Sequence, residues 1–570
     1  MFAVIREKVY LTPFLLLLLL LVLQTPLMAP FFHDGFFPTH DGIQTIRIFE
    51  YYQSLKFGAF PPRWASGLLY GYGYPLFVFY NPVVYLLGSI FVFAGFNFLT
   101  ATKIVFILGF LLGVAGIFLL LREFTDNLSA FVGSIIYSLA PYRAVDVYIR
   151  GDLAEFFAFS LFPLILWLNL KFLKSQKVFS SIYPLSVLLA LLILSHNISA
   201  FIYLIFLFGF NIFYIFIYIK KKRRIEIFHK LLWSVCLSLA MSCFYWLPLL
   251  VEMRFVQIER VTTAFSYTQY YLTLEQIWQS AWGFGGFLQE NPMSLQLGKM
   301  IILLSLLALF LNLLVKTKMK KMIIFIGLVL MGSTFLETRS SQFIWKGVAL
   351  LGFLQFPWRL HILSTVCGVI LSGFFVYLLE DLVDGWKKKG KILILVLAAG
   401  VILLSYEESH TFFREKYFFE DKPVAETTTG EEYLPKWVKT KPSDYPPDKV
   451  VFLKGSGRIE NLEWGYHRKK FTAISSEDSQ IRLAHIYYPG WTAYVNNSRA
   501  EIDYSNEGGV MEISIPKGRN VVSFVFRRTW WGLIADAISL TGGITTLALV
   551  CKSLILGHPH PILLENGKDN

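Results

Sequence analysis

The first hydrophobic segment is followed by a loop with two closely spaced triplets, His33-Asp34-Gly35 and His40-Asp41-Gly42. A carboxylate here can take a proton from an attacking hydroxyl, or hold a hard divalent cation that neutralises phosphate. Such pairs also form simple turns in solvated loops, so a purely structural role is the alternative. Asp41 is the stronger candidate, because an amphipathic stretch from Ile43 to Leu55 follows it directly.

A second polar cluster lies between two later hydrophobic runs and contains Arg143, Asp146, Arg150, Asp152 and Glu155. The charge pattern of the loops places this cluster on the same side of the membrane as Asp41. An ion-pair network at the membrane interface is the alternative to a binding site. Asp41 and Asp152 are the candidate ligands if the site holds a divalent cation, Mg²⁺ or Mn²⁺.

Two further residues at the outer ends of hydrophobic runs complete the set of candidates. His196, in Ser195-His196-Asn197, interrupts two apolar runs, although a single histidine there more often serves as a hydrogen-bonding residue at a helix end. Arg359 enters the outer end of a later apolar run. Its planar guanidinium suits a phosphate group, and an interfacial arginine beside Trp358 is the plainer interpretation.

The composition places these candidates in a multi-pass membrane protein. The chain has 570 residues, 55% hydrophobic and 16% charged, with a mean hydropathy of +0.54. At roughly 20 apolar residues per crossing we expect about twelve helices. They begin near Tyr10, Ile104, Leu128, Phe156, Ile182, Ile198, Lys230, Gly298, Met322, His361, Lys391 and Trp530. All four cysteines fall within these runs, which indicates neither a disulfide framework nor a cysteine metal site.

Clusters of positive charge set the expected orientation. They follow three hydrophobic runs, at 220–224, 316–321 and 387–391, and Arg6 and Lys8 precede the first run. Because such clusters stay in the cytoplasm, the crossings alternate consistently only if Leu76 to Gly95 does not cross. The first outer loop then extends over residues 29–103, and both chain ends are cytoplasmic. The net charge of +13 is explained by lipid headgroups, so no nucleic-acid partner is expected.

The expected domains are a transmembrane domain over 1–406, a mostly β domain over 407–528, and a last helix with a cytoplasmic tail over 529–570. Charge parity places the β domain outside the cytoplasm. Short alternating runs separated by turn residues predict a small antiparallel sandwich there. The expected strands are Val450 to Leu453, Ile481 to Tyr487, Trp491 to Val495, Met511 to Ile515 and Val521 to Phe526. The run after Arg6 and Lys8 lacks a clear cleavage site, so we interpret it as a retained helix.

Several short motifs resemble a known family over nearly the whole chain. They are Thr39-His40-Asp41-Gly42, Pro61-Pro62-Arg63-Trp64, Arg150-Gly151-Asp152-Leu153-Ala154-Glu155-Phe156, Gln355-Phe356-Pro357-Trp358-Arg359 and Tyr487-Tyr488-Pro489-Gly490-Trp491. The chain resembles the membrane proteins called 6-pyruvoyl-tetrahydropterin synthase related, yet it has no soluble pterin-synthase domain and no zinc-binding histidine triad. It is also similar to the GT-C superfamily of membrane glycosyltransferases.

The resemblance implies a plasma-membrane enzyme that uses a polyprenyl-phosphate sugar as donor, with Asp41 as the catalytic acid residue of the first outer loop. The acceptor would be an envelope glycan, lipid or protein. The expected substrate-binding residues are Asp34, His40, Arg150, Asp152, Glu155, His196 and Arg359. A noncatalytic scaffold for envelope assembly and a lipid or polysaccharide transporter remain the alternatives. Few charged residues lie within the runs, which gives a transport path little support.

Overall fold

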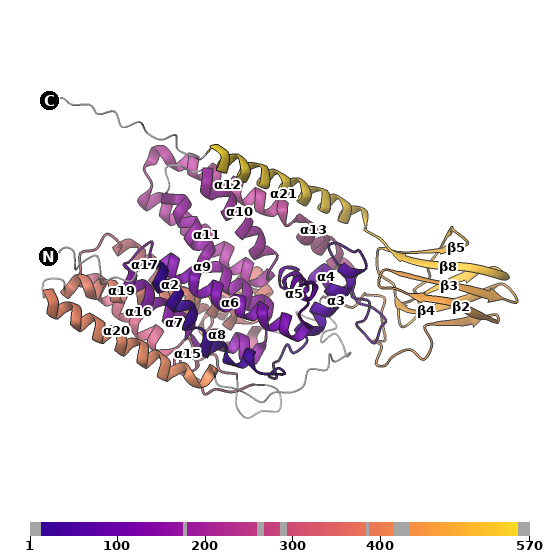
Figure 1. Cartoon of the computed structure of the whole chain (residues 1–570), viewed down its shortest axis with the longest axis horizontal. Helices are drawn as coiled ribbons and strands as arrows, with labels where there is room; N and C mark the ends of the chain where they lie inside the picture. Colours follow the sequence, from indigo (N-terminus) through magenta and orange to yellow (C-terminus); the bar gives the residue numbers. More distant parts are fainter. Residues whose placement is uncertain are drawn as a thin grey trace.

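The computed structural model describes residues 13–174, 179–258, 267–285, 293–383, 387–413 and 433–556. A body of helices carries a separate β domain at one end, close to α3, α4 and α5 (Figure 1). The last helix, α21 (Trp530–Leu556), leaves the β domain and runs back along the helical body beside α13 and α12 (Figure 1). The predicted start of the first helix near Tyr10 and the whole of the segment predicted to be irregular, Glu426 to Gly430, lie outside the described residues.

Seven helical segments are long and apolar enough to cross a membrane: Pro13–Phe32, Phe98–Leu121, Leu153–Lys174, Asn197–Tyr218, Pro357–Val383, Lys389–Phe413 and Trp530–Lys552. Two bent pairs raise this to nine among the described residues, Asn127–Ser138 with Pro141–Arg150 and Lys221–Met241 with Cys243–Phe255. The other three predicted crossings coincide with shorter helices, α10 (Phe179–Ile193), α16 (Lys299–Leu314) and α17 (Lys320–Leu336). The mostly helical class is confirmed, and the number twelve stays a prediction.

The stretch that was expected not to cross forms two short helices. These are α4 (Leu76–Phe79) and α5 (Val83–Phe93), with 4 and 11 residues. Neither reaches the roughly 20 residues that a crossing needs. Asn97 then caps the long helix α6 (Phe98–Leu121), because its side-chain oxygen accepts the backbone N–H of Thr100 at 2.7 Å.

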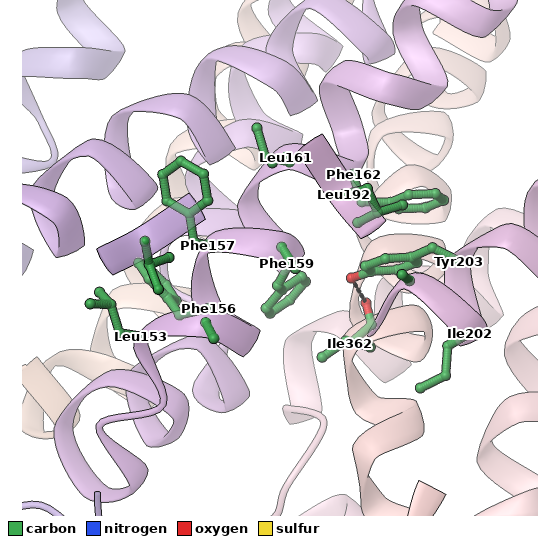
Figure 2. Packing of buried hydrophobic residues seen from close by; sticks show 14 of the residues in the cluster. Leu153, Phe156, Phe157, Phe159, Leu161, Phe162, Leu192, Ile202, Tyr203 and Ile362 are labelled. Carbon is green, nitrogen blue, oxygen red and sulfur yellow. Dashed lines mark hydrogen bonds between the residues drawn. The ribbon is translucent and has the colours of Figure 1, made fainter. Parts of the chain in front are cut away.

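The core of the helical body is built around α9 (Leu153–Lys174), an aromatic-rich helix that packs along α6. Phe162 of α9 stacks on Tyr203 of α11 (Asn197–Tyr218), with ring centroids 3.7 Å apart. The hydroxyl of Tyr203 donates to the carbonyl of Ile362 in α19 (His361–Val383) at 3.2 Å (Figure 2). Three helices distant in sequence therefore share one packed layer.

Glycines let α6 and α9 approach closely. A Cβ at position 109 would lie 2.6 Å from the ring of Phe156, and one at 116 would lie 2.9 Å from the backbone nitrogen of Leu164. Small residues at such contacts are typical of helix packing in membranes. The start of α9, where the candidate acids lie, is thus held tightly against α6.

Other helices lie at the edge of the body. Only 17% of the most apolar window of α21 is buried, compared with 83% of the window that contains α19. The remaining helices are α2 (Pro13–Val22), α3 (Gln44–Lys56), α7 (Asn127–Ser138), α8 (Pro141–Val145), α12 (Lys221–Met241), α13 (Cys243–Glu252), α15 (Leu274–Trp278), α18 (Gln342–Gly347) and α20 (Lys387–Ser409). Since α20 reaches Ser409, it passes the domain boundary expected after residue 406.

The β domain has two antiparallel sheets, ordered β1-β4-β7 and β2-β3-β8-β5-β6. The strands are β1 (Val450–Lys454), β2 (Gly457–Trp464), β3 (Arg468–Ser475), β4 (Ser479–Ile486), β5 (Trp491–Val495), β6 (Ser498–Ala500), β7 (Val510–Ile515) and β8 (Gly518–Phe526). Both sheets contribute buried residues to its core, for example Phe471 and Val522 from one and Ile481 and Ile513 from the other. The five predicted strands are present, and β2, β3 and β6 were missed.

The β domain contacts the loop that follows the first helix. The indole nitrogen of Trp64 donates to Nε2 of His485 at 3.0 Å, and the backbone N–H of Ile486 donates to the carbonyl of Tyr72 at 2.8 Å. These bonds show that the first loop and the β domain are in direct contact, and the position of both outside the cytoplasm stays a prediction.

Candidate active site

Backbone hydrogen bonds join the loop of Asp41 to the segment of Arg150. The N–H of His40 donates to the carbonyl of Ile149, and that of Asp41 to the carbonyl of Arg150, both at 2.8 Å. The side-chain amide of Gln44 donates to the carbonyl of Gly151 at 3.1 Å. Two motifs that are more than a hundred residues apart in the chain therefore form a single site.

Local geometry at Gly151 allows this close contact. Arg150 ends a π-helical turn, η2 (Asp146–Arg150), and Gly151 follows with a φ of 64°. A Cβ at this position would lie 2.4 Å from the hydroxyl oxygen of Thr39. Glycine is required here both for the left-handed backbone and for the space. Such π turns occur frequently at functional sites.

Arg150 lies at the centre of the cluster and binds three carboxylates. Its Nη1 lies 2.6 Å from Oδ1 of Asp146 and 2.5 Å from Oε1 of Glu155, and its Nη2 lies 3.0 Å from Oδ2 of Asp152. Asp152 also accepts the backbone N–H of Glu155 at 3.0 Å, which caps the start of α9. The cap of α9 and the ion pairs with Arg150 thus hold Asp152 and Glu155 in place together.

Arg359 joins the cluster from a distant part of the chain. Its Nε lies 3.2 Å from Oε2 of Glu155, and its Nη1 donates to the carboxamide of Gln355 at 2.6 Å and to the carbonyl of Leu354 at 3.1 Å. It lies in η7 (Pro357–Leu360), directly before α19. Glu155 therefore binds two guanidinium groups, that of Arg150 nearby in the sequence and that of Arg359, which is 204 residues away.

His196 caps α11 and faces the same acids. Its Nδ1 accepts the backbone N–H of Ser199 at 3.3 Å. Burial lowers the pKa of His196, and the charges of Asp152 and Glu155 oppose this effect. The lowered pKa favours the neutral imidazole, whose Nδ1 makes the capping bond.

Three of these side chains lie close enough together to hold a metal ion. One ligand atom each of Asp152, Glu155 and His196 lies within 4.8 Å of the others. This set differs from the predicted pair, since it contains Asp152 and not Asp41. Both oxygens of Glu155 already accept from Arg150 and Arg359. Carboxylates with one imidazole suit a cation such as Mn²⁺ better than Mg²⁺, which prefers oxygen ligands and water.

Asp41 is electrostatically tied to this cluster. Burial raises the pKa of its carboxyl above the ordinary value, and the charge of Asp152 raises it further. The guanidinium groups of Arg47, Arg150 and Arg359 act in the opposite direction. A carboxylate with a raised pKa is a better proton acceptor than an ordinary aspartate, as a general base requires.

His40, the neighbour of Asp41, is held by hydrogen bonding. Its Nε2 lies 2.7 Å from the carbonyl oxygen of Phe284, and burial lowers its pKa. The neutral ring therefore donates to this carbonyl and holds the loop of Asp41 against a second segment of the chain.

Residues 77–331 match the family model described as a 6-pyruvoyl-tetrahydropterin synthase related domain of membrane proteins. This match confirms the family resemblance. No curated protein matches the sequence.

Solved structures that align with this chain include sugar-transferring enzymes by their names. The apo oligosaccharyltransferase of Archaeoglobus fulgidus aligns with a TM-score of 0.50 and 12% identity, over 73% of this chain and 57% of that chain. The same enzyme tethered to an acceptor peptide aligns at 0.49, with 12% identity, over 77% and 61%. The mycobacterial arabinofuranosyltransferase AftD aligns at 0.43, with 11% identity, over 72% and 27%. The first match shows a common fold, and this chain spans little more than half of that enzyme.

Two residues of the site, Arg47 and Tyr142, were not identified from the sequence. Arg47 of α3 is buried, and its guanidinium donates to the hydroxyls of Tyr80 at 3.0 Å and Tyr85 at 3.4 Å. Tyr142 donates to Oε1 of Glu155 at 2.7 Å. A basic residue within the amphipathic stretch behind Asp41 was the signal for Arg47, whereas nothing in the sequence pointed to Tyr142.

Asp34 and Arg143 lie apart from this network. Asp34 is exposed, and in the described part of the chain no hydrogen bond or ion pair joins its carboxylate to the other candidates. Arg143 is fully buried among aromatic rings, 4.2 Å above the ring of Tyr137, with one long hydrogen bond to Ser160. Arg143 therefore packs beneath the site.

Proposed function

We propose that this protein transfers a sugar from a polyprenyl-phosphate donor to an acceptor of the cell envelope, at the outer face of the plasma membrane. The observation that carries the proposal is the union of the Asp41 loop with the cluster of Arg150, Asp152, Glu155 and Arg359. A noncatalytic scaffold would not need these residues to lie together, so their convergence in one site favours an enzyme. The oligosaccharyltransferase with the common fold is a sugar-transferring enzyme by name.

In the proposed reaction Asp41 accepts the proton of an acceptor hydroxyl. The hydroxyl oxygen bonds to the anomeric carbon, the bond from that carbon to the phosphate oxygen breaks, and the lipid phosphate leaves with the electron pair. Positive charge develops on the sugar ring, and a nearby carboxylate stabilises it, as in glycoside hydrolysis. Asp41 thus has two roles: it accepts the proton of the hydroxyl and stabilises the positive charge that develops on the sugar ring.

Arg359 and Arg47 are the proposed phosphate-binding residues. Arg150 is fully engaged by acids, whereas Arg359 keeps its Nη2 outside the hydrogen bonds described above. Arg47 forms no ion pair with a carboxylate among the described residues and donates only to phenol hydroxyls. A buried guanidinium without a carboxylate partner is costly, and an anionic ligand would offset that cost.

Asp152 and His196 would hold a divalent cation, and such a cation would help to neutralise the phosphate, while the carboxylate of Asp41 stays free to act as the base. His40, Arg150 and Glu155 would keep these ligands and the Asp41 loop in place. Asp34, which is exposed, would meet substrate only at the entrance of the site. The β domain would lie outside the cytoplasm and both chain ends inside.

The decisive experiment replaces Asp41 with asparagine. We expect Asp41→Asn to lower sugar transfer about a hundredfold or more, because the general base is lost while the shape of the side chain is kept. Purified protein would be incubated with radiolabelled polyprenyl-phosphate sugars and envelope acceptors. The control is Asp448→Asn, which changes an exposed acid of the β domain. Undiminished transfer by Asp41→Asn would remove this residue from the mechanism.

A further inference from the structure

The β domain carries an open groove at the edge formed by β5, β6 and the turn before β7. It consists of two adjoining hollows of about 360 and 630 Å³, which share Glu501 and Ile502. Its aromatic wall comes from Trp437, Tyr487 and Tyr504, and Arg499, Glu501 and Asp503 line its polar rim. None of these residues belongs to the Asp41 cluster.

The aromatic wall is rigid. The rings of Tyr487 and Tyr504 stack with centroids 4.1 Å apart and an angle of 11° between their planes. Trp437 lies 5.2 Å from Tyr504, and its indole N–H donates to the carbonyl of Tyr487 at 3.0 Å. All three side chains are half-buried, so part of each ring stays accessible. A ligand would meet a wall that is already ordered, at little entropic cost.

The polar rim offers groups that can accept hydrogen bonds. The side chains of Glu501 and Arg499 are exposed and form no hydrogen bond or ion pair with other described residues. Asp503 accepts from the hydroxyl of Ser505 at 2.7 Å. Glu512, deeper in the groove, accepts from Gln480 at 3.1 Å and from Arg482 at 2.8 Å. Arg482 neutralises Glu512 through this ion pair, so Glu501 and Asp503, against Arg499, leave the described lining with a small net negative charge.

This combination selects one class of ligand. Flat aromatic faces match the C–H faces of sugar rings, and carboxylates accept hydrogen bonds from sugar hydroxyls. The small net negative charge disfavours phosphates, nucleic acids and anionic glycans relative to uncharged or cationic ligands. We propose that this groove binds an uncharged or amino-substituted oligosaccharide. Two adjoining hollows suit a chain of sugars better than a single ring.

The Trp437 end of the groove lies where the β domain meets the helical body. The ring of Trp437 is 6.4 Å from that of Phe255, at the end of the helical segment that follows α13. Gln257 donates to the carbonyls of Pro435 at 3.1 Å and Val438 at 2.8 Å, on both sides of Trp437. A bound oligosaccharide would thus be held beside the membrane-embedded part of the protein.

The test is a titration of the purified full-length protein with neutral, amino-substituted and anionic oligosaccharides and with an unstructured peptide, followed by calorimetry. We expect binding of a neutral or amino-substituted oligosaccharide, weakened about tenfold or more by Tyr504→Ala and by Glu501→Gln. The matched controls on the same domain, Tyr445→Ala and Glu463→Gln, should bind as the original protein does. Circular dichroism and melting curves would verify that each variant is folded.

Three outcomes would overturn the proposal. They are the absence of binding by any neutral or amino-substituted oligosaccharide, undiminished binding by both groove variants, and binding of the peptide alone. Asp41→Asn should bind the oligosaccharide normally, because the groove is separate from the transfer site. Loss of binding in that variant would place the oligosaccharide at the transfer site and not in the groove. Failure of the transfer assay, in contrast, leaves the groove proposal unaffected.

Discussion

Two buried polar clusters of this protein are built differently. In the central cluster, acids and arginines touch directly, and Glu155 accepts from both Arg150 and Arg359. In the junction cluster, where α3 meets the β domain, Glu50 and Lys469 are both buried but do not pair. Glu50 accepts the N–H of Gly67 at 3.0 Å and the hydroxyl of Tyr466 at 3.2 Å. The ammonium of Lys469 donates to Ser66 at 2.8 Å and to the carbonyl of Gly465.

The difference teaches what burial does when the countercharge is not in contact. Burial raises the pKa of Glu50 to about 7 and lowers the pKa of Lys469 to about 7. Neutral hydrogen-bond partners only partly compensate for lost hydration. The junction can therefore titrate at physiological pH, whereas in the central cluster Glu155 is in direct contact with two countercharges.

Glu155→Gln should produce the largest effect, because it leaves two buried guanidinium groups without their shared acid. Breaking a buried ion pair by removing one partner typically costs about 3–5 kcal/mol. Thermal unfolding of the purified protein, followed by circular dichroism, would show a clear loss of stability at neutral pH. A melting temperature equal to that of the unmodified protein would mean that the central ion pairs contribute nothing to the fold.

The matched change at the junction, Glu50→Gln, should alter the pH dependence. The folded pKa of about 7 lies above the ordinary 4.5, so the folded state holds a proton that the unfolded state has lost between these values. Stability therefore falls as the pH rises from 4.5 to 7, by about 3 kcal/mol in full. Glu50→Gln should remove this fall. Melting curves recorded across this pH range would test it, and an equally steep fall in the variant would contradict it.

The same contrast explains what the sequence could predict. Long apolar runs and charged loops indicated the helical body, and the spacing of Arg150, Asp152 and Glu155 marked the local half of the site. The pairing of Glu155 with Arg359 spans 204 residues, and no local pattern contains it. Neither does a sequence show that Glu50 and Lys469 are buried near each other.

The β domain shows the same limit at the level of strands. Alternating apolar residues revealed β4, β5 and β7, whereas β3 begins Arg468-Lys469-Lys470 and looks solvated. Lys469 is nevertheless buried, because it docks against the first loop. A strand whose inward residue serves a domain contact breaks the pattern on which strand prediction depends.

Asp41 is the member of the central cluster that behaves like the junction, because it forms no ion pair among the described residues and its pKa is raised by burial and by Asp152. As the proposed base, it must be ionised, so sugar transfer should rise with pH through this raised pKa. Asp152→Asn removes the repulsion and should move the rising limb to lower pH, a smaller effect than those above. Transfer rates measured against pH, each scaled to its own maximum, separate this shift from a loss of substrate binding. Asp444→Asn serves as the exposed control. A limb that stays in place would show that burial alone, and not the neighbouring charge, sets the proton affinity of Asp41.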